Sequence, residues 1–453
     1  MERMGDGQVK TEWGSTRTRA AAILLAGLLT AEQLALGANG PLLAILAAGA
    51  QIALAIAVLI LLAPPAAFWR PAAPVLILAL ATIGWIALHA LPGRAIAPDL
   101  VAPGLVRAIG LLALLLAAAW IGYRRGLMRI AIGWIVLFGL VQIATGLILR
   151  GIDPGHVWGV DKGILADRFT GTSLNANASA CLFGVIALLG LGRWLTLMRE
   201  SGEDRDSGIV ARIAALLGLT MGTGACFITG SRTALLLLIA GLAFVAGRDP
   251  LLRRRLLRPR GLAMLAVAGF VLVMLALTIG DVTLERMAMT TTDAVTRVEI
   301  WRHYAALAQR SWLWGYGPLS FDEVNLMSLR TAAQASLLWY VHSAHNQILS
   351  LLLGGGVPYL VLVTATMAAI LLAIHRQRDP KRADPLLRAM MVATAFVLAC
   401  AMVDITLDVP AMAALQVVLL GLPWGRAVRR MVDLRRSAER LPPPTGAALH
   451  SPR

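Results

Sequence analysis

Two histidines and an asparagine stand close together in the sequence HSAHN, as His342, His345 and Asn346. The histidines are three residues apart, so they share one face if the segment is helical. A neutral imidazole, with an unperturbed pKa of about 6.5, suits a general base that takes a proton from a hydroxyl group. Asn346 orients such a base or caps the apolar helix that follows. A metal site is disfavoured, because no carboxylate or cysteine follows at ligand spacing.

Arg232 lies in the sequence ITGSRTALL, where Gly230 and Ser231 predict the start of a helix. A cation at a helix N-terminus opposes the helix dipole, so the position is unfavourable unless an anion binds there. The free amide groups at a helix N-terminus also bind phosphate oxygens. The pattern favours an anion site, and an arginine that only reaches lipid head groups is the alternative.

Arg297 lies in the sequence TRVEIW, near the first turn of an amphipathic helix predicted from Asp293 to Gln309. Such a helix lies flat on a membrane surface and holds Arg297 where a lipid-linked pyrophosphate presents its charge. A solvated arginine is the alternative. The predicted apolar stripe consists of Val298, Trp301, Ala305 and Leu307 or Ala308, and Trp312, Trp314 and Tyr316 follow at head-group level.

Polar residues also occupy the stretch from Gly151 to Ser179. Arg168 and Asn177 are candidates for substrate contact, as are His342 and Asn346, and capping of the next helix by Ser173 or Asn175 is the alternative for this stretch. The stretch from Asp404 to Pro410 shows no pattern that predicts a role.

The elements that position these residues are apolar. The chain has 453 residues, of which 58% are hydrophobic and 15% charged, and its mean hydropathy is +0.74. A soluble domain cannot bury so much apolar surface, so the sequence predicts an all-α, polytopic membrane protein. The net charge of +16 comes from basic clusters between apolar runs, which indicates contact with membrane lipid and no nucleic acid. The three cysteines lie in apolar runs, so neither a disulfide nor a zinc site is expected.

About twelve apolar segments are long enough to cross a bilayer. The basic loops, such as those at 124–129 and 248–260, alternate with less basic ones, which places both termini in the cytoplasm and the loop at 281–345 outside. The predicted organisation is therefore helices one to nine within 1–280, a large catalytic loop at 281–345, three helices within 346–424 and a basic tail at 425–453. The predicted spans are 18–36, 41–63, 74–91, 104–122, 130–150, 174–195, 209–229, 232–247, 261–280, 346–374, 388–405 and 409–424.

Many membrane glycosyltransferases hold a divalent cation through an acidic D-x-D pair. The D-x-D in this sequence, Asp204 and Asp206, falls in a loop assigned to the cytoplasm. We therefore expect no metal and no cofactor, with arginines neutralising a leaving pyrophosphate.

The ordered set SRTALL, TRVEIW, LWGYGP, HSAHN and GGGVP resembles the O-antigen ligase and Wzy-type polymerase superfamily. The resemblance is close over about residues 165 to 375 and extends to the rest of the chain by topology. It implies an inverting, metal-independent glycosyltransferase on the periplasmic side of the bacterial inner membrane, which takes a glycan from undecaprenyl pyrophosphate. By motif position, Arg232 and Arg297 look like the pyrophosphate-binding pair and His345 like the catalytic base, while His342 is an additional histidine beside it.

Three acceptors are compatible with this resemblance. Lipid A core is expected for a ligase, another lipid-linked repeat for a polymerase, and a protein Ser or Thr for an O-oligosaccharyltransferase. We favour the ligase, because one outer loop dominates the chain. A transporter of the same lipid-linked glycan is the competing class, but the sequence shows no internal repeat of the kind that many transporters have.

Overall fold

A computed structural model describes residues 16–200, 205–256, 258–259, 290–378 and 384–439. These residues form helices and one short β-hairpin, in which β1 (His156–Val157) pairs antiparallel with β2 (Val160–Asp161). The prediction of an all-α membrane protein is confirmed. The α-helices are α1 (Thr16–Leu34), α2 (Pro41–Leu62), α3 (Trp69–Leu88), α4 (Val101–Tyr123), α5 (Leu127–Ile152), α6 (Ala176–Arg199), α7 (Arg205–Ile228), α8 (Arg232–Gly247), α9 (Pro250–Leu256), α12 (Thr290–Arg310), α13 (Phe321–Ser328), α14 (Ala332–Leu338), α15 (Gln347–Arg376), α16 (Pro385–Ala401) and α17 (Pro410–Glu439).

Eight helical stretches within the described residues are long and apolar enough to cross a membrane. They contain α2 to α7, α15 and α17, while α8 and α16 are shorter apolar helices. Each predicted span coincides with a helix except 261–280, which lies outside the described residues. The described part of the bundle is therefore built from the apolar segments that the sequence indicated.

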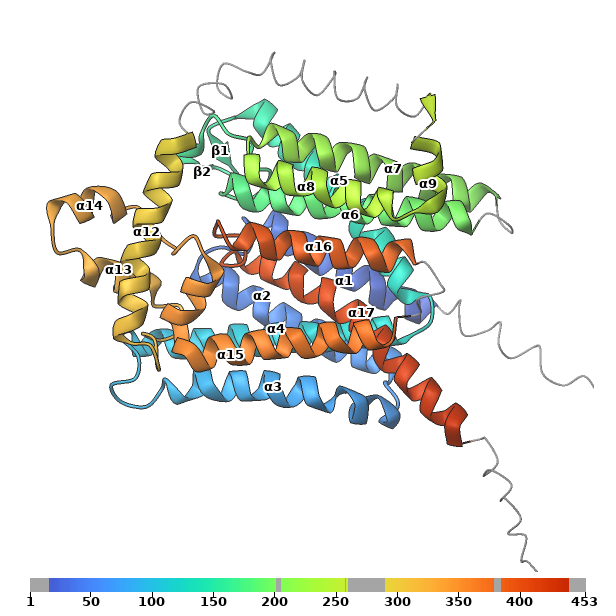
Figure 1. The fold of residues 1–453 in the computed structure, drawn as a ribbon, viewed down its shortest axis with the longest axis horizontal. Coiled ribbons are helices and arrows are strands. Elements are labelled where there is room, and N and C mark those ends of the chain that lie inside the picture. The colour runs from blue at the N-terminus through green and yellow to red at the C-terminus, as the bar shows by residue number, and fades with distance from the viewer. Residues whose placement is uncertain (1–15, 201–204, 257, 260–289, 379–383, 440–453) are drawn as a thin grey trace, which may run out of the picture.

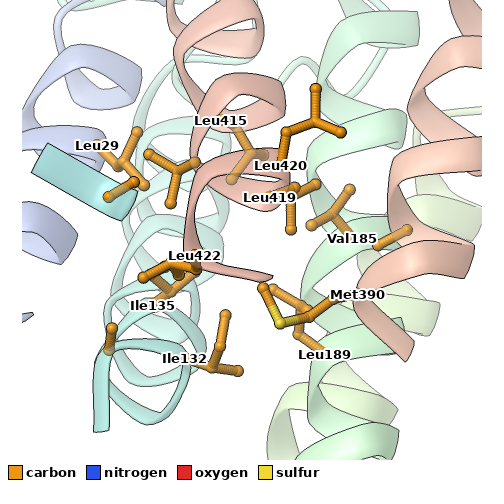
Figure 2. Close-up of a cluster of buried hydrophobic side chains, with 14 of the residues drawn as sticks. Leu29, Ile132, Ile135, Val185, Leu189, Met390, Leu415, Leu419, Leu420 and Leu422 are labelled. Carbon is orange, nitrogen blue, oxygen red and sulfur yellow. The ribbon is translucent and has the colours of Figure 1, made fainter. Parts of the chain in front are cut away.

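Helices α6 and α17 lie at the centre of the bundle. Leucine, isoleucine and valine side chains from α1, α5, α6 and α17 meet there with Met390 of α16 (Figure 2). Glycines let α17 approach α4 closely, since a Cβ on Gly425 would lie 1.8 Å from the carbonyl oxygen of Ala119 and one on Gly122 would lie 1.9 Å from that of Leu422. Small residues at such crossings bring helix backbones into direct van der Waals contact, which is how helices associate in a lipid environment.

Helix α12 runs across one end of this bundle, with α13 and α14 beyond it (Figure 1). The predicted helix is present, but its predicted apolar stripe is wrong in part. Val298 is 39% exposed, whereas Ile300 and Tyr304 are buried together with Leu307 and Ala308. The physical reason is that α12 shares a small core with α13, α14 and the start of α15, which selects the face carrying its bulkier Ile300 and Tyr304.

The glycines of GGGVP break α15. Gly355 and Gly356 leave the helical conformation, and Gly356 has a φ of 68°. The segment WLWGYGP packs directly onto this break: the amide of Tyr316 donates to the carbonyl of Leu353 (2.7 Å), and the amide of Val357 donates to that of Trp312 (2.8 Å). The motifs WLWGYGP and GGGVP are thus held together by backbone hydrogen bonds, and we call this contact the joint.

Trp314 in this joint packs against α3. Its ring stacks on Trp85 with centroids 4.6 Å apart, Arg94 lies 4.2 Å above it, and the Nε2 atom of His89 is 2.8 Å from its carbonyl oxygen. Trp312, by contrast, is 59% exposed. Trp314 therefore fastens the chain between α12 and α13 to the bundle.

Replacing Gly356 with alanine should destabilise the protein by about 1–3 kcal/mol or more, because the residue would be strained at positive φ. The added Cβ would also meet the Leu313 carbonyl oxygen at 2.1 Å. Gly354→Ala is the matched control, since its Cβ would meet only the edge of Tyr359 at 4.0 Å. Thermal unfolding in detergent measures both variants, and equal midpoints would contradict this account of the joint.

Candidate active site

A buried carboxylate, Asp404, lies at the centre of a polar cluster at the end of the bundle where α12 lies. It belongs to the loop between α16 and α17 and is 6% exposed. Its Oδ2 atom accepts hydrogen bonds from Nδ2 of Asn177 (2.5 Å) and Nη2 of Arg297 (3.1 Å). Its Oδ1 atom lies 3.8 Å from Nδ1 of His345. Three segments distant in the sequence therefore meet at one carboxyl group.

Arg297 projects from α12 onto this carboxylate. Its Nη1 atom also donates to the carbonyl oxygen of Val403 (2.8 Å), one residue before Asp404. These two contacts fix the plane of the guanidinium, while 34% of the side chain remains exposed. An arginine held in this way can present donors to an anion from a fixed position.

Arg168 and Asn177 extend the cluster to the turn between α7 and α8. The Oδ1 atom of Asn177 accepts from Nη2 of Arg168 (3.1 Å). Arg168 also donates from Nε and Nη2 to the carbonyl oxygen of Thr229, at 3.2 and 3.1 Å. Since α8 begins at Arg232, three residues after Thr229, these bonds connect the helix terminus that carries Arg232 to Asp404.

A buried lysine organises the loop from which Arg168 extends. The ammonium of Lys162 donates to the carbonyl oxygens of Pro154 (2.7 Å), Ala166 (3.1 Å) and Arg168 (2.7 Å). Burial lowers the pKa of Lys162, as does the charge of Arg150, against the opposing charges of Asp167 and Asp153. The β-hairpin loop is thereby closed on itself and presents Arg168 to Asn177.

His345 is held by its backbone in an uncommon conformation, with a φ of 50°. Its amide donates to Oγ of Ser343 (3.2 Å), and its carbonyl oxygen accepts from Nε1 of Trp301 (3.2 Å). Its side chain is 29% exposed, and Nδ1 faces Asp404 without a close hydrogen bond to it. The imidazole is therefore positioned by α12 and by the loop that precedes α15.

His342 lies apart from this cluster. Its Nδ1 atom is 3.0 Å from Oδ1 of Asp322 in α13, and both side chains are largely exposed. The structure thus brings His345, Arg297, Arg168 and Asn177 together around Asp404. His342 lies outside this cluster, with its side chain exposed.

Asn346 and Asn175 are helix caps. The Oδ1 atom of Asn346 accepts from the amides of Ile348 (3.0 Å) and Leu349 (3.2 Å), and its Nδ2 donates to the carbonyl oxygen of Met402. Asn175 caps α6 in the same way, through the amides of Asn177 and Ala178. Of the two roles open to Asn346 in the sequence, the structure shows the cap, which also ties α15 to the end of α16.

The charges around Asp404 determine its protonation. Burial acts to raise the pKa of this carboxyl, but nearby His345 and Arg297 and the amide of Ile405 outweigh burial and lower it below its ordinary value. Asp404 therefore stays ionised at neutral pH. An ionised carboxylate beside Nδ1 favours a proton on that nitrogen, which leaves Nε2 of His345 as the proton acceptor.

Sequence reasoning missed Asp404, because the stretch from Asp404 to Pro410 carried no recognised motif. A signal was nonetheless present. Asp404 stands at the end of the predicted span 388–405, and Asp408 follows four residues later, just before the predicted span 409–424. Acidic residues at such places are costly to bury and are retained where they pair with a cation or serve a function.

The arrangement offers two kinds of chemistry. His345 can take up a proton, and the guanidinium groups of Arg297 and Arg168 can bind an anion. Among the residues that the structure describes, no group of three or more His, Cys, Asp or Glu side chains is arranged to hold a metal ion.

Residues 214–364 match the family model described as O-antigen ligase. The matched segment begins in α7, contains Arg232, Arg297 and His345, and ends in α15. The resemblance to the O-antigen ligase and Wzy-type superfamily is thereby confirmed. No curated protein sequence matches the chain.

Asp404→Asn should lower stability at neutral pH, because the variant loses the charge that pairs with Arg297. The pKa of this carboxyl is lower in the folded state than in the unfolded state, where it is 3.8. Its charge therefore stabilises the fold above pH 3.8, and this stabilisation is lost as the pH falls through the folded-state pKa. The difference in thermal midpoint between parent and variant should therefore shrink below pH 3.8. Thermal midpoints from neutral pH to about pH 3 measure it.

Asp322→Asn is the control for this experiment, since Asp322 pairs with an exposed histidine. It should change the midpoint little at any pH. If the difference in thermal midpoint between the parent and Asp404→Asn stays unchanged in acid, the carboxylate charge does not stabilise the cluster.

Proposed function

We propose that the protein is a glycosyltransferase that moves a glycan, such as an O-antigen, from undecaprenyl pyrophosphate to a sugar hydroxyl of lipid A core. The family match supports a membrane enzyme of the ligase or polymerase type. The observation that carries the proposal is the convergence of His345 and Arg297 on Asp404. The His345 imidazole thus lies near an arginine that is fixed by hydrogen bonds, at the end of an apolar bundle, which supports its proposed role as proton acceptor.

In the proposed reaction, Nε2 of His345 accepts the proton of the acceptor hydroxyl as its oxygen attacks the anomeric carbon. The bond from that carbon to the pyrophosphate oxygen breaks, and the lipid pyrophosphate leaves with the bonding electrons. A single displacement of this kind inverts the anomeric configuration. Asp404, 3.8 Å from Nδ1, stabilises the imidazolium that forms.

Arg297 and Arg232 are proposed to bind the pyrophosphate, with Arg168 and Asn177 contacting the substrate or supporting these arginines. Charge develops on the leaving oxygen as the glycosidic bond breaks, and donors fixed near that oxygen lower the barrier. The contacts of Arg297 with Val403 and Asp404 supply such fixation. We propose that these arginines supply the positive charge and that no divalent cation or other cofactor is needed.

The proposed location is the bacterial inner membrane, with both termini in the cytoplasm and the catalytic loop at 281–345 in the periplasm. The basic turn at 124–129 joins α4 to α5, whereas the β-hairpin loop beside Arg168 follows the other end of α5. The basic turn and the polar cluster therefore lie at opposite ends of the bundle, as the positive-inside rule requires of this orientation.

Other acceptors define the alternatives: a growing glycan for a polymerase and a protein hydroxyl for an O-oligosaccharyltransferase. A transporter of the lipid-linked glycan would need no proton acceptor at the site. The purified protein, mixed with lipid-linked oligosaccharide and rough lipopolysaccharide, should form glycosylated lipopolysaccharide at the same rate with and without a chelator. Absence of any transfer would contradict the proposal, and transfer only to lipid-linked glycan or to protein would favour the corresponding alternative.

His345→Ala should abolish transfer, because it removes the proton acceptor beside Asp404. His342→Ala should leave a substantial rate, since that side chain is exposed and paired with Asp322. Turnover of the two purified variants under saturating donor measures the difference. A greater loss in His342→Ala would move the role of base to that residue.

Arg297→Lys and Arg232→Lys should each reduce turnover by about 10² or more, as expected for the loss of a preorganised donor. Lysine keeps the charge but offers a point charge on a flexible stem in place of a planar fork. Arg302→Lys is the matched control, because Arg302 is exposed on the same helix as Arg297. Parental turnover in both test variants would leave these arginines with a role in topology alone.

A further inference from the structure

A second carboxylate, Asp408, lies in the same loop as Asp404 and makes a separate set of contacts. Its Oδ2 atom accepts hydrogen bonds from Oγ of Ser343 and from Oγ of Ser350 (3.3 Å). Its carbonyl oxygen accepts from Nη2 of Arg107 in α4 (3.1 Å). The proposed reaction gives this carboxylate no part, yet one of its two serine partners stands two residues before His345.

Ser343 connects Asp408 to His345 through a single hydroxyl group. A serine hydroxyl carries one proton and two acceptor lone pairs. Its proton points to the Asp408 carboxylate, so a lone pair is left to receive the amide of His345 at 3.2 Å. Ser343 is 5% exposed, so water has little access to replace either partner. Asp408 thereby determines which way this hydroxyl is oriented.

The conformation of His345 explains why such a connection is needed. A φ of 50° is uncommon for a residue other than glycine and persists only where the surroundings enforce it. Two side chains do so here: Ser343 binds the amide of His345, and Trp301 binds its carbonyl oxygen. Without them the backbone could relax, and the imidazole would leave its place beside Asp404.

We propose that Asp408 is a positioning residue, which acts through Ser343 to hold His345 in the conformation that places its imidazole beside Asp404. The proposal rests on the proposed function in so far as His345 is the base. Asp408 itself touches neither substrate nor the reacting atoms. Its contribution is to supply a hydrogen-bond acceptor at the right place.

The alternative is that Asp408 acts on His345 by its charge. Burial raises the pKa of the Asp408 carboxyl, against the hydrogen bond from Ser343 and the charge of Arg107. The effect of its hydrogen-bond-accepting oxygen must therefore be separated by experiment from the effect of its charge. Asparagine keeps a side-chain oxygen that can accept from Ser343 but carries no charge, whereas alanine removes both. Ser343→Ala removes the link and leaves the charge in place.

Ser343→Ala and Asp408→Ala should each lower kcat by about 10- to 100-fold, as expected when a catalytic group is displaced by a small distance. The donor KM should change little, because the pyrophosphate-binding arginines are untouched. Asp408→Asn should keep most of the parental kcat. The Ser343→Ala/Asp408→Ala double variant should lose no more than either single variant, since both break one connection.

Ser350→Ala is the matched control, because Ser350 also binds Oδ2 of Asp408 but has no contact with the His345 backbone among the described hydrogen bonds. Its kcat should be parental. The proposal that Asp408 positions His345 through Ser343 is wrong if Ser343→Ala keeps the parental kcat, whatever the Asp408 variants do. It is also wrong if Asp408→Asn loses as much as Asp408→Ala, because charge would then be the operative property.

A second measurement needs no substrate and so separates this proposal from the proposed function. Diethyl pyrocarbonate modifies imidazoles, and peptide mass spectrometry gives the rate for His345 relative to the exposed His342 in the same sample. The ratio should change several-fold in Ser343→Ala and Asp408→Ala but not in Ser350→Ala or Asp408→Asn. If the ratio shifts while the parent transfers no glycan, the positioning stands and the proposed function fails. An unchanged ratio in all variants overturns the positioning.

Discussion

The cost of burying the Asp404 carboxylate at the end of an apolar bundle is the constraint on which the site depends. A carboxylate removed from water is stable only where cations and donors surround it. Asn177, Arg297 and His345 meet this requirement from α6, α12 and the loop before α15. The same contacts that keep Asp404 ionised also fix Arg297 and leave the carboxylate 3.8 Å from the His345 imidazole, so stability and proposed catalysis depend on one cluster.

The segment that carries Arg297 is itself packed and is attached to the bundle. The α12 to α14 segment has its own small core around Tyr304, whose hydroxyl donates to Asn325. It is fastened to the bundle where Trp314 stacks on Trp85 and where Gly356 admits the carbonyl of Leu313. A catalytic group is held accurately only when its supporting shell is itself packed, which explains why loop residues here are tied to helices at both sides.

Much of the architecture could be predicted because its signals are local. Apolar runs predicted the described helices of the bundle, and Ser231 before Arg232 predicted the start of α8. The face of α12 could not be predicted, since the choice of Tyr304 over Val298 for burial depends on which neighbours pack against the helix. Whether Asn346 caps or orients was likewise undecided, because both roles suit the same residue.

By itself, the sequence determined the membrane class, the order of the helices and the identity of the candidate base and arginines, since these follow from composition, periodicity and motif. Only the tertiary structure decided that Asp404 joins them and that Asp408 reaches His345 through Ser343. It also separated His342 from His345, although the two share one short motif. The physical reason is that hydrogen bonds between segments depend on distances of a few ångströms in the folded protein, and the positions of residues along the sequence do not determine these distances.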